Sequence, residues 1–369
     1  MLFITSEFIQ LIYQFFFKKS KLIGFLGLSI LAYLGGTADP MTTTDYTMYS
    51  MQYTNAAHGN FYFERGYSEL GLFLYNHGLD YAKARIVFFI LSTIILYIGV
   101  SRFTKNIALF SALYGITVFF NDATQVRNYM TISLVILGLS FLINNTIKNN
   151  IIAICLIILS AQFQSIGYFF LIVVIFVWLG NRLPEELVKK SVYIFLLLTI
   201  LLIIFVKFSG VAAVVSLLTK MASLVGGRAN LVSKISGQYA NGASFNQILL
   251  DSVATIFGVV TANVILNTQS NVSDRFVKVK ILYMGVISSL IALPMLFLAI
   301  DYSRIQRNSF LFVLIIISIY FEKRRNITKN GIAIFVMTIS TCILYAGTHY
   351  LIWGEQFQKS IPFLMKLVK

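Results

Sequence analysis

Arg127 is the side chain in this sequence whose position most calls for a chemical explanation. It stands at the start of a long apolar run, three residues after Thr124 and four before Thr131, so the three would form one polar stripe on a helix. Arginine inside an apolar segment is costly and marks a functional candidate, and its planar guanidinium suits a diphosphate. Asp122 and Gln125 precede it as candidate substrate-binding residues. The alternative is that Arg127 extends to nearby lipid headgroups.

A second candidate segment combines one carboxylate with several tyrosines. In a helix, Tyr46, Tyr49 and Tyr53 would share one face beside Asp45. Such an aromatic and carboxylate surface suits sugar rings. The alternative is a set of tyrosines at the membrane interface with a solvated aspartate.

Adjacent opposite charges form the third candidate segment. Glu64 could be a general base toward a sugar hydroxyl, and Arg65 could bind phosphate. An ion pair within a loop is the alternative of equal weight.

The fourth candidate is a polar turn, Gln162–Ser165, which contains Gln164 and separates two short apolar runs. Runs 150–162 and 166–180 are both short for a hydrocarbon layer of about 30 Å. We expect the turn to dip into the outer part of the membrane and line a cavity. A turn that faces water in locally thinned lipid is the alternative.

The fifth candidate segment holds two arginines one helical turn apart. Arg304 and Arg307 could bind a pyrophosphate together, unless Asp301 simply neutralises Arg304. Arg228 is a weaker candidate of the same kind.

The sequence has no glycine-rich phosphate loop and no histidine, cysteine and carboxylate cluster at metal-ligand spacing. ATP-driven or metal-dependent chemistry is therefore disfavoured, and we expect no cofactor. Cys155 and Cys342 lie inside apolar runs, where a thiol behaves as a small hydrophobic group. The histidines His58, His77 and His349 have no partner pattern, and we interpret them as surface residues.

The elements that must position these residues are membrane helices. The chain is 58% hydrophobic and only 12% charged, whereas soluble domains are about a quarter charged. Its apolar runs approach the roughly 20 residues of a membrane helix, which predicts an all-α polytopic fold of about twelve (11–13) spans, some short or re-entrant. The candidate spans are 2–17, 22–37, 86–101, 106–120, 128–143, 150–162, 166–180, 191–206, 247–267, 280–298, 308–321 and 331–348.

The orientation of the predicted spans follows from their basic connections. Short cytoplasmic loops are enriched in lysine and arginine, and the basic connections alternate along this chain. They are Lys18/Lys19/Lys21, Arg102/Lys105, Lys148, Arg182/Lys189/Lys190, Arg275/Lys278/Lys280 and Lys323/Arg324/Arg325/Lys329. The net charge of +15 then reflects topology and attraction to lipid headgroups, and nucleic acid is not an expected partner.

We expect residues 1–369 to form a single membrane domain with two large loops on the outer face, 38–85 and 207–246. The second contains an apolar stretch, 211–225, predicted to lie on the outer surface as an interfacial helix. The first run, 2–17, is predicted to span the membrane, and an interfacial helix is the alternative.

The order of these motifs resembles the EpsG family of polysaccharide polymerases. The resemblance rests on Asp45-Tyr46 with Tyr49, Glu64 to Tyr67 (Glu-Arg-Gly-Tyr), Gln125 to Asn128 (Gln-Val-Arg-Asn) and the break Gln162–Ser165. It covers about residues 20–185 and continues more loosely to Arg304 and Arg307. Family members commonly carry an arginine where this chain has Gly35 to Pro40, and a histidine where it has Gln164.

The resemblance implies a Wzy-type glycosyltransferase of capsule or exopolysaccharide assembly in the bacterial cytoplasmic membrane. It would polymerise repeat units linked to polyprenyl pyrophosphate at the outer leaflet, without a metal, beside a flippase and a chain-length regulator. Arg127 would bind the donor pyrophosphate, assisted by Arg304 or Arg307. Asp45 or Glu64 would be the base, with Glu64 or Asp122 as the alternative positioning residues.

Other functional classes remain open at this point. A flippase for lipid-linked oligosaccharides, or another transporter, would line a central path with charges from both halves of the chain. An O-antigen-ligase-like transferase or a membrane acyltransferase would share the outer-face chemistry with a different acceptor. A structural membrane scaffold would need none of these residues.

Overall fold

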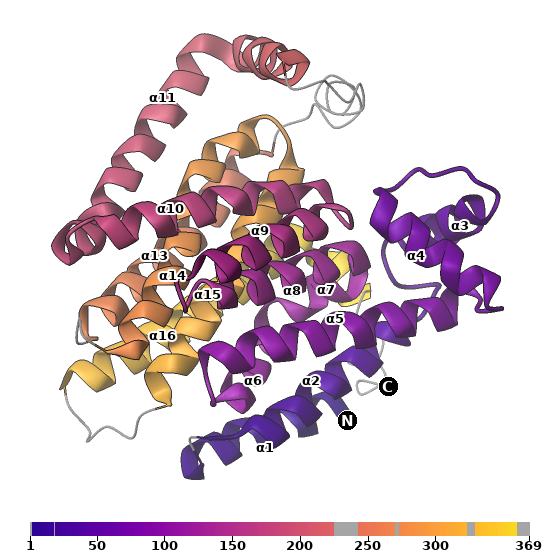
Figure 1. The fold of residues 1–369 in the computed structure, drawn as a ribbon, viewed down its shortest axis with the longest axis horizontal. Coiled ribbons are helices and arrows are strands. Elements are labelled where there is room, and N and C mark those ends of the chain that lie inside the picture. Colours follow the sequence, from indigo (N-terminus) through magenta and orange to yellow (C-terminus); the bar gives the residue numbers. More distant parts are fainter. Residues whose placement is uncertain (1, 18, 225–242, 270–272, 323–328, 360–369) are drawn as a thin grey trace.

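The computed structural model describes the chain except for residues 1, 18, 225–242, 270–272, 323–328 and 360–369 (Figure 1). The described residues form helices and no strand, which confirms the predicted all-α class. The elements are α1 (Leu2–Phe16), α2 (Lys21–Gly36), α3 (Tyr46–Ala57), α4 (Arg65–Asn76), α5 (Tyr81–Phe103), α6 (Ile107–Thr117), α7 (Phe119–Thr124), α8 (Val126–Phe141), α9 (Ile147–Ala161), η1 (Ser165–Phe170), α10 (Leu171–Arg182), α11 (Glu185–Leu224), α13 (Phe245–Asn267), α14 (Asp274–Ala292), η2 (Leu293–Phe297), η3 (Ile300–Tyr302), α15 (Ser303–Phe321) and α16 (Lys329–Lys359).

The helices have the length and composition of a polytopic membrane protein. Within the described ranges, 7 helical segments are long and apolar enough to cross a membrane, and α2, α6, α8 and α9 are shorter apolar helices. Each predicted run coincides with a helix or with a consecutive pair of helical elements. The polytopic membrane fold is therefore confirmed.

Three boundaries differ from the sequence-based expectation. The helix predicted from residue 86 begins at Tyr81, because the Asp80 side chain accepts a hydrogen bond from the Lys83 amide and caps it. The run 106–120 breaks at Val118 into α6 and α7. The predicted loop after residue 206 continues instead as helix to Leu224, in a stretch with one glycine and no proline. The rest of that loop, 225–242, lies outside the described residues.

The loop predicted over 38–85 contains two short helices. Figure 1 shows α3 and α4 together, projecting beyond the end of the long helices. Three tyrosines of α3, Tyr46, Tyr49 and Tyr53, and Tyr67 of α4 are buried, so the two helices share a small aromatic core with the start of α5. A loop with its own packed core can hold side chains in fixed positions.

The helices α14 and α15 form the interior of the bundle. Their span windows are 83% and 89% buried inside the protein, against 22% for that of α11, which lies at the periphery (Figure 1). Polar side chains carried by α15 are therefore shielded from lipid by the surrounding helices.

The first helix packs against the bundle along α2 and α6. Its polar residues Ser6, Glu7 and Gln10 are buried, while Phe8 and Ile12 face outward. The Glu7 carboxylate lies against Gly115 of α6, where a Cβ would meet it at 2.7 Å. A helix with its polar side toward the protein and its apolar side outward is suited to lipid, which disfavours the isolated interfacial alternative.

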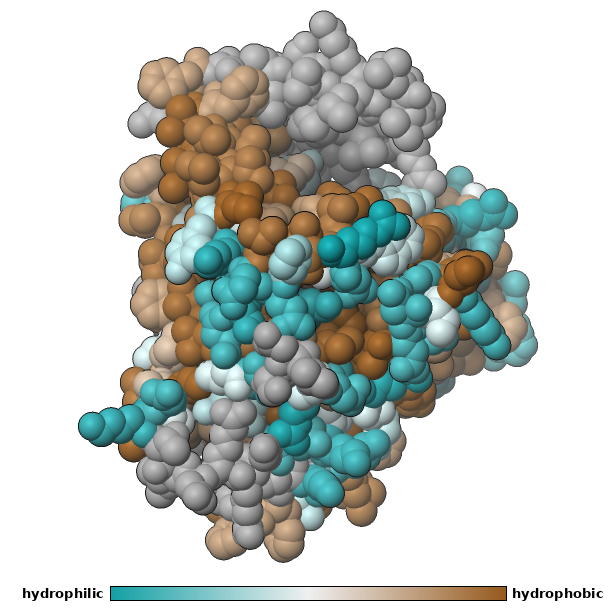
Figure 2. Space-filling model, turned by 60° about the vertical axis from the view of Figure 1, so that its left-hand side comes forward, coloured by the Kyte–Doolittle hydropathy of each residue, from teal (hydrophilic) through white to brown (hydrophobic). Residues whose placement is uncertain are grey.

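One end of the bundle joins two of the basic connections to the end of α15. The Ser20 amide donates to the Lys105 carbonyl at 3.0 Å, linking the start of α2 to the end of α5. The Glu322 carboxylate after α15 accepts hydrogen bonds from the Thr104 hydroxyl and the Lys105 amide at 2.9 and 3.0 Å. Figure 2 shows hydrophilic residues gathered on this side, with apolar surface beside them.

The close contact between α2 and α6 generates a prediction. A Cβ on Gly24 would lie 2.6 Å from the Ala108 backbone nitrogen, so Gly24→Ala forces backbone movement. We expect a loss of about 1–3 kcal/mol of stability, measured as a lower unfolding temperature of the purified protein. Gly347→Ala is the control, since nothing lies within 4 Å of its added Cβ. Equal unfolding temperatures for the two variants would contradict this packing.

Candidate active site

The opposite end of the bundle brings together three candidate segments that are distant in sequence. Glu64 precedes α4, Arg127 is the second residue of α8, and Ser165 begins η1. The Arg127 Nη1 donates to Glu64 Oε2 in an ion pair, and the Ser165 amide donates to Glu64 Oε1 at 3.0 Å. Each oxygen of the Glu64 carboxylate is therefore engaged.

Aromatic rings complete the surroundings of Arg127. Its guanidinium carbon lies 3.9 Å from the centroid of Phe63 and 5.6 Å from that of Tyr49, and its Nε donates to the Tyr49 hydroxyl at 3.4 Å. The Arg127 and Glu64 side chains are only 14% and 11% exposed. Arg127 thus turns toward carboxylate and aromatic partners in the protein, which disfavours the headgroup-binding alternative.

A glycine allows the α4 segment to reach the polar turn after α9. A Cβ on Gly66 would lie 2.8 Å from Gln162 Cβ and 2.9 Å from its carbonyl oxygen. The next residue, Tyr67, donates its amide to that carbonyl at 3.2 Å. The Glu-Arg-Gly-Tyr motif therefore docks on the turn, and Gln164 within it is buried with a side-chain oxygen that has no partner among the described residues.

The predicted tyrosine face exists, but it is not an open sugar platform. Tyr46, Tyr49 and Tyr53 share one face of α3, and all three are buried. Tyr46 and Tyr53 pack against Tyr81 with ring centroids 5.0 and 5.7 Å away. Asp45 is exposed at the start of α3 with a φ of 65°. Asp45 takes no part in the described contacts of Glu64 and Arg127. Because it is exposed and the tyrosine rings are buried, they do not form one surface.

Two predicted arginines have neighbours of their own on the protein surface. Arg65 is exposed and pairs with Glu69 at 2.5 Å, one turn along α4, so it does not share a target with Glu64. Arg304 pairs with Asp301 at 3.0 Å, the neutralising alternative weighed from the sequence. Arg228 lies outside the described residues.

Arg307 differs from Arg304 because its side chain is buried. Its side chain is 1% exposed, and its Nη2 donates to the Gln125 side-chain oxygen, two residues before Arg127. Its Nε has no partner in the part of the chain that the structure describes. The two arginines of α15 therefore do not face one common site in this structure, and Arg307 alone joins the α8 start.

Asp122 lies beneath this contact in a hydrogen-bonded network. Its carboxylate accepts from the Asn128 amide and the Tyr114 hydroxyl, both at 3.1 Å, and Asn128 exchanges hydrogen bonds with Asn308 at 2.9 Å. Burial raises the pKa of Asp122 to about 6, while the charge of Arg307 and these hydrogen bonds act in the opposite direction. We interpret Asp122 as a positioning residue that fixes α7 and α8 against α15.

Sequence reasoning missed Arg85, a fully buried cation at the start of α5. Its Nε donates to the Gly35 carbonyl at 3.0 Å, its Nη1 to the Tyr81 hydroxyl at 3.4 Å, and its Nη2 to the Ala123 carbonyl. It joins the end of α2 to α7. Its contact at Gly35 lies in the segment Gly35 to Pro40, where other members of the EpsG family commonly carry an arginine. The signal was its place at the edge of an apolar run.

Sequence reasoning also missed two ionisable residues beside Arg307. Asp251 of α13 is 7% exposed and interacts electrostatically with Arg307. His349 of α16 is 4% exposed, so its interpretation as a surface residue was wrong. An acidic residue inside the apolar run 247–267 was the available signal for Asp251.

The arrangement is suited to an anionic group that leaves during group transfer. Arg127, in the first turn of α8, and Arg307, which donates to the preceding Gln125, are fixed cations with little exposure to solvent, where charge stabilisation is strong. Among the described residues, no group of three or more histidine, cysteine or acidic side chains could hold a metal ion.

The docking of α4 on the turn generates a prediction for activity. Gly66→Ala places a methyl group against the Gln162 backbone and should displace Glu64, with a 10- to 100-fold loss of product at a shift of about 1 Å. Gly71→Ala on the same helix is the control, because its Cβ would meet the Tyr53 ring at 3.4 Å, an ordinary contact. Glycan product from equal amounts of membrane-inserted protein is the measurement. Normal product from Gly66→Ala would contradict the role of this contact.

Comparison with known proteins supplies the family. The EpsG family matches residues 20–358, nearly the whole chain and well beyond the 20–185 range where the motifs are recognisable. No curated protein and no solved structure matches the chain. The motif residues of the first half and Arg307 of the second half converge on the α8 start, so one site uses both parts of the matched region. The chain belongs to the EpsG family of Wzy-type polysaccharide polymerases.

Proposed function

We propose that this protein polymerises oligosaccharide repeat units linked to polyprenyl pyrophosphate at the outer leaflet of the bacterial cytoplasmic membrane. The observation that carries the proposal is Arg127, a shielded guanidinium held by Glu64 and by aromatic rings at the bundle end opposite the basic connections. The family membership supports polysaccharide polymerisation in general. The lipid-linked substrate and the outer leaflet are the parts that we add.

The proposed reaction transfers the growing glycan to a single repeat unit. A hydroxyl oxygen of the lipid-linked acceptor forms a bond with the anomeric carbon of the donor glycan, and the bond from that carbon to the pyrophosphate oxygen breaks. The polyprenyl pyrophosphate leaves with the electron pair, and the hydroxyl proton passes to a base. Because the leaving group supplies the driving force, no nucleotide or metal is required.

Arg127 has donors left for the leaving group. A guanidinium carries five N–H bonds, and the described contacts of Arg127 use Nη1 toward Glu64 and Nε toward Tyr49. We assign the remaining donors to the donor pyrophosphate and Glu64 to the positioning of Arg127. Arg307 assists through its free Nε, and Gln164 offers a buried amide to a sugar hydroxyl.

The outward orientation rests on charge. The basic connections that contain Lys21 and Lys105 meet at one end with the end of α15, and lysine-rich short loops favour the cytoplasm. Glu64 and Arg127 lie at the other end. At that face we expect lipid-linked substrates from a flippase of the same pathway and control by a chain-length regulator.

The alternatives require a different distribution of charge or a different acceptor. A flippase would line a path that opens to both sides, whereas the two buried arginines of the described chain, Arg85 and Arg307, and the slightly exposed Arg127 gather at one end. An O-antigen-ligase-like transferase would use the same donor site with another acceptor. Product analysis separates these classes.

A deletion strain tests the proposed function. Loss of a polymerase should leave single lipid-linked repeats on the outer side of the membrane and no long chains. Loss of a flippase should leave the repeats inside, and loss of a ligase should leave long lipid-linked chains that are not transferred. Long surface polymer that persists in the deletion strain would refute the proposal.

Arg127→Lys tests the pyrophosphate assignment. Lysine keeps the charge but loses the planar guanidinium, so polymer synthesis should fall by about 100-fold. Arg65→Lys is the matched control, because Arg65 is exposed and bound only to Glu69 among its described contacts. Full-length polymer at normal levels from the Arg127→Lys strain would show that the assignment is wrong.

A further inference from the structure

The proposed glycosyl transfer needs a base, and the carboxylates identified from the sequence do not fit that role. Both Glu64 oxygens are engaged, by Arg127 and by the Ser165 amide. Both Asp122 oxygens accept hydrogen bonds as well. Asp45 is exposed on α3, outside these contacts. Because protein donors already occupy both oxygens of Glu64 and of Asp122, a carboxylate without such donors is the better candidate for the proton acceptor.

Asp251 is a shielded carboxylate that remains unengaged. It lies six residues after the start of α13 and is 7% exposed, and none of the side-chain hydrogen bonds or ion pairs found among the described residues involves it. The charge of Arg307 acts on it. An ionisable side chain in a membrane helix is costly to keep and marks a functional candidate. The helix that carries Asp251, α13, packs against α15, which carries Arg307.

Helix α16 contributes further polar groups to the surroundings of Arg307. His349 is buried with an Nδ1 that has no partner in the described residues, and its ring lies 4.3 Å from that of Tyr345. The Tyr345 ring stacks on Phe310 at 3.7 Å, while its hydroxyl also lacks a described partner. Arg307 interacts electrostatically with both Tyr345 and His349. Several polar groups around Arg307 thus have no partner among the described residues.

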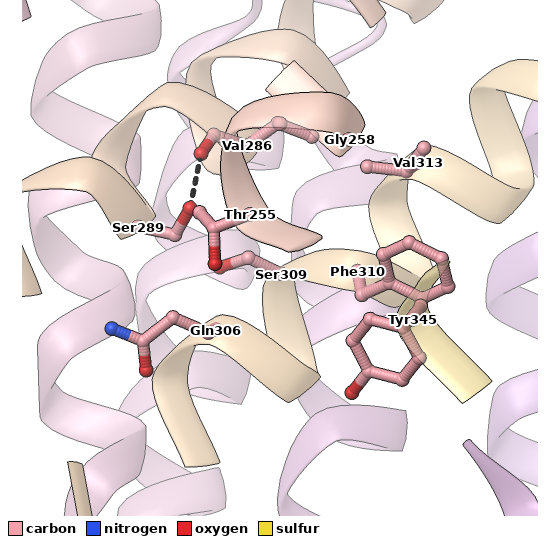
Figure 3. A pocket seen from close by; sticks show the side chains of 9 residues that line it. All are labelled: Thr255, Gly258, Val286, Ser289, Gln306, Ser309, Phe310, Val313 and Tyr345. Atoms are coloured by element: carbon pink, nitrogen blue, oxygen red, sulfur yellow. Dashed lines mark hydrogen bonds between the residues drawn. The ribbon is translucent and has the colours of Figure 1, made fainter. Parts of the chain in front are cut away.

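A small cavity lies between α13, α14, α15 and α16, and Tyr345 is among the residues that line it (Figure 3). Thr255, Ser289, Gln306, Ser309 and Tyr345 line it together with apolar residues, and the Ser309 hydroxyl has no partner among the described atoms. It has room for about one water molecule. A space of this size could accept a single hydroxyl group.

The two buried cations are linked across the start of α8. Arg307 donates to the Gln125 side chain, and Arg127 follows two residues later. A base near Arg307 and a pyrophosphate on Arg127 would therefore both lie beside one short segment. A transfer between two substrates requires such proximity, because the base and the leaving group act at the same anomeric carbon.

We propose that Asp251 is the general base of the transfer, an inference that rests on the proposed function. Its carboxylate takes the proton of the acceptor hydroxyl while that oxygen bonds to the anomeric carbon and the pyrophosphate leaves with the electron pair. Arg307 on α15 places a positive charge beside Asp251, and the cavity, which Thr255 one helical turn further along α13 helps to line, takes the acceptor hydroxyl. The first half of the chain would thus provide the cation for the donor, Arg127, and the second half would provide the base for the acceptor, Asp251.

Asp251→Asn, assayed as purified protein with synthetic lipid-linked repeat units, tests the assignment. It keeps the shape and removes the basicity, so we expect kcat to fall at least about 100-fold while KM for the repeat unit changes less than about threefold. Asp251→Glu should restore part of kcat. Asp274→Asn is the control, because that carboxylate is 75% exposed and pairs with Lys278 on α14.

The outcomes separate this inference from the proposed function. If the wild-type protein does not extend lipid-linked repeats, the proposed function fails and the base with it. If it does, and Asp251→Asn with an unchanged unfolding temperature keeps more than a tenth of kcat, only the base assignment is overturned. Should the asparagine variant not accumulate, Asp251→Glu and Asp251→Gln give the same comparison, and equal kcat values for that pair overturn the assignment.

Discussion

The ion pair between Arg127 and Glu64 determines how the end of this protein opposite the basic connections is organised. A guanidinium in an apolar helix needs a partner that compensates its charge. Here the partner is the Glu64 carboxylate, which lies more than sixty residues earlier in the sequence. The second oxygen of Glu64 binds the Ser165 amide, which fixes the turn after α9 as well. One pair of charges therefore requires three separate stretches of chain to meet.

Around this pair, buried polar residues take the place that hydrophobic packing has elsewhere. Arg85 joins α2, α5 and α7, and Asp122 with Asn128 and Asn308 joins α7, α8 and α15. Inside a membrane, water is not available to hydrogen-bond a polar group, so each buried polar group needs a partner in the protein. These contacts therefore specify one arrangement of the helices. The starts of α8 and α15 also lie in this region, and helix N-termini favour anionic ligands. The protein is thus preorganised for negative charge before any substrate binds.

The remainder of the bundle is a scaffold with two different ends. Close approach at Gly24 and Gly66 lets neighbouring segments pack at short distance, and the buried α14 and α15 form the centre. The end with basic connections is tied by Ser20, Lys105 and Glu322. The opposite end carries the buried arginines, so charge separates the two faces of the protein.

The sequence by itself determined the membrane class, the helices and most of their boundaries, because a long apolar run in lipid has only one way to satisfy its backbone. It also identified Glu64, Arg127 and the turn at Gln164 as candidates, since polar residues at the edge of apolar runs stand out. The continuation of α11 to Leu224 escaped it, because an apolar stretch with one lysine is compatible with several placements.

Only the tertiary structure decided which candidates act together. Arg65 and Glu64 are neighbours in sequence but bind different partners, while Arg307 and Gln125, 182 residues apart, share a hydrogen bond. Asp251 and His349 came into view only because α13 and α16 pack beside Arg307. Helix periodicity shows which side of a helix is polar, but not which helix it will face, since that depends on the packing of the whole bundle.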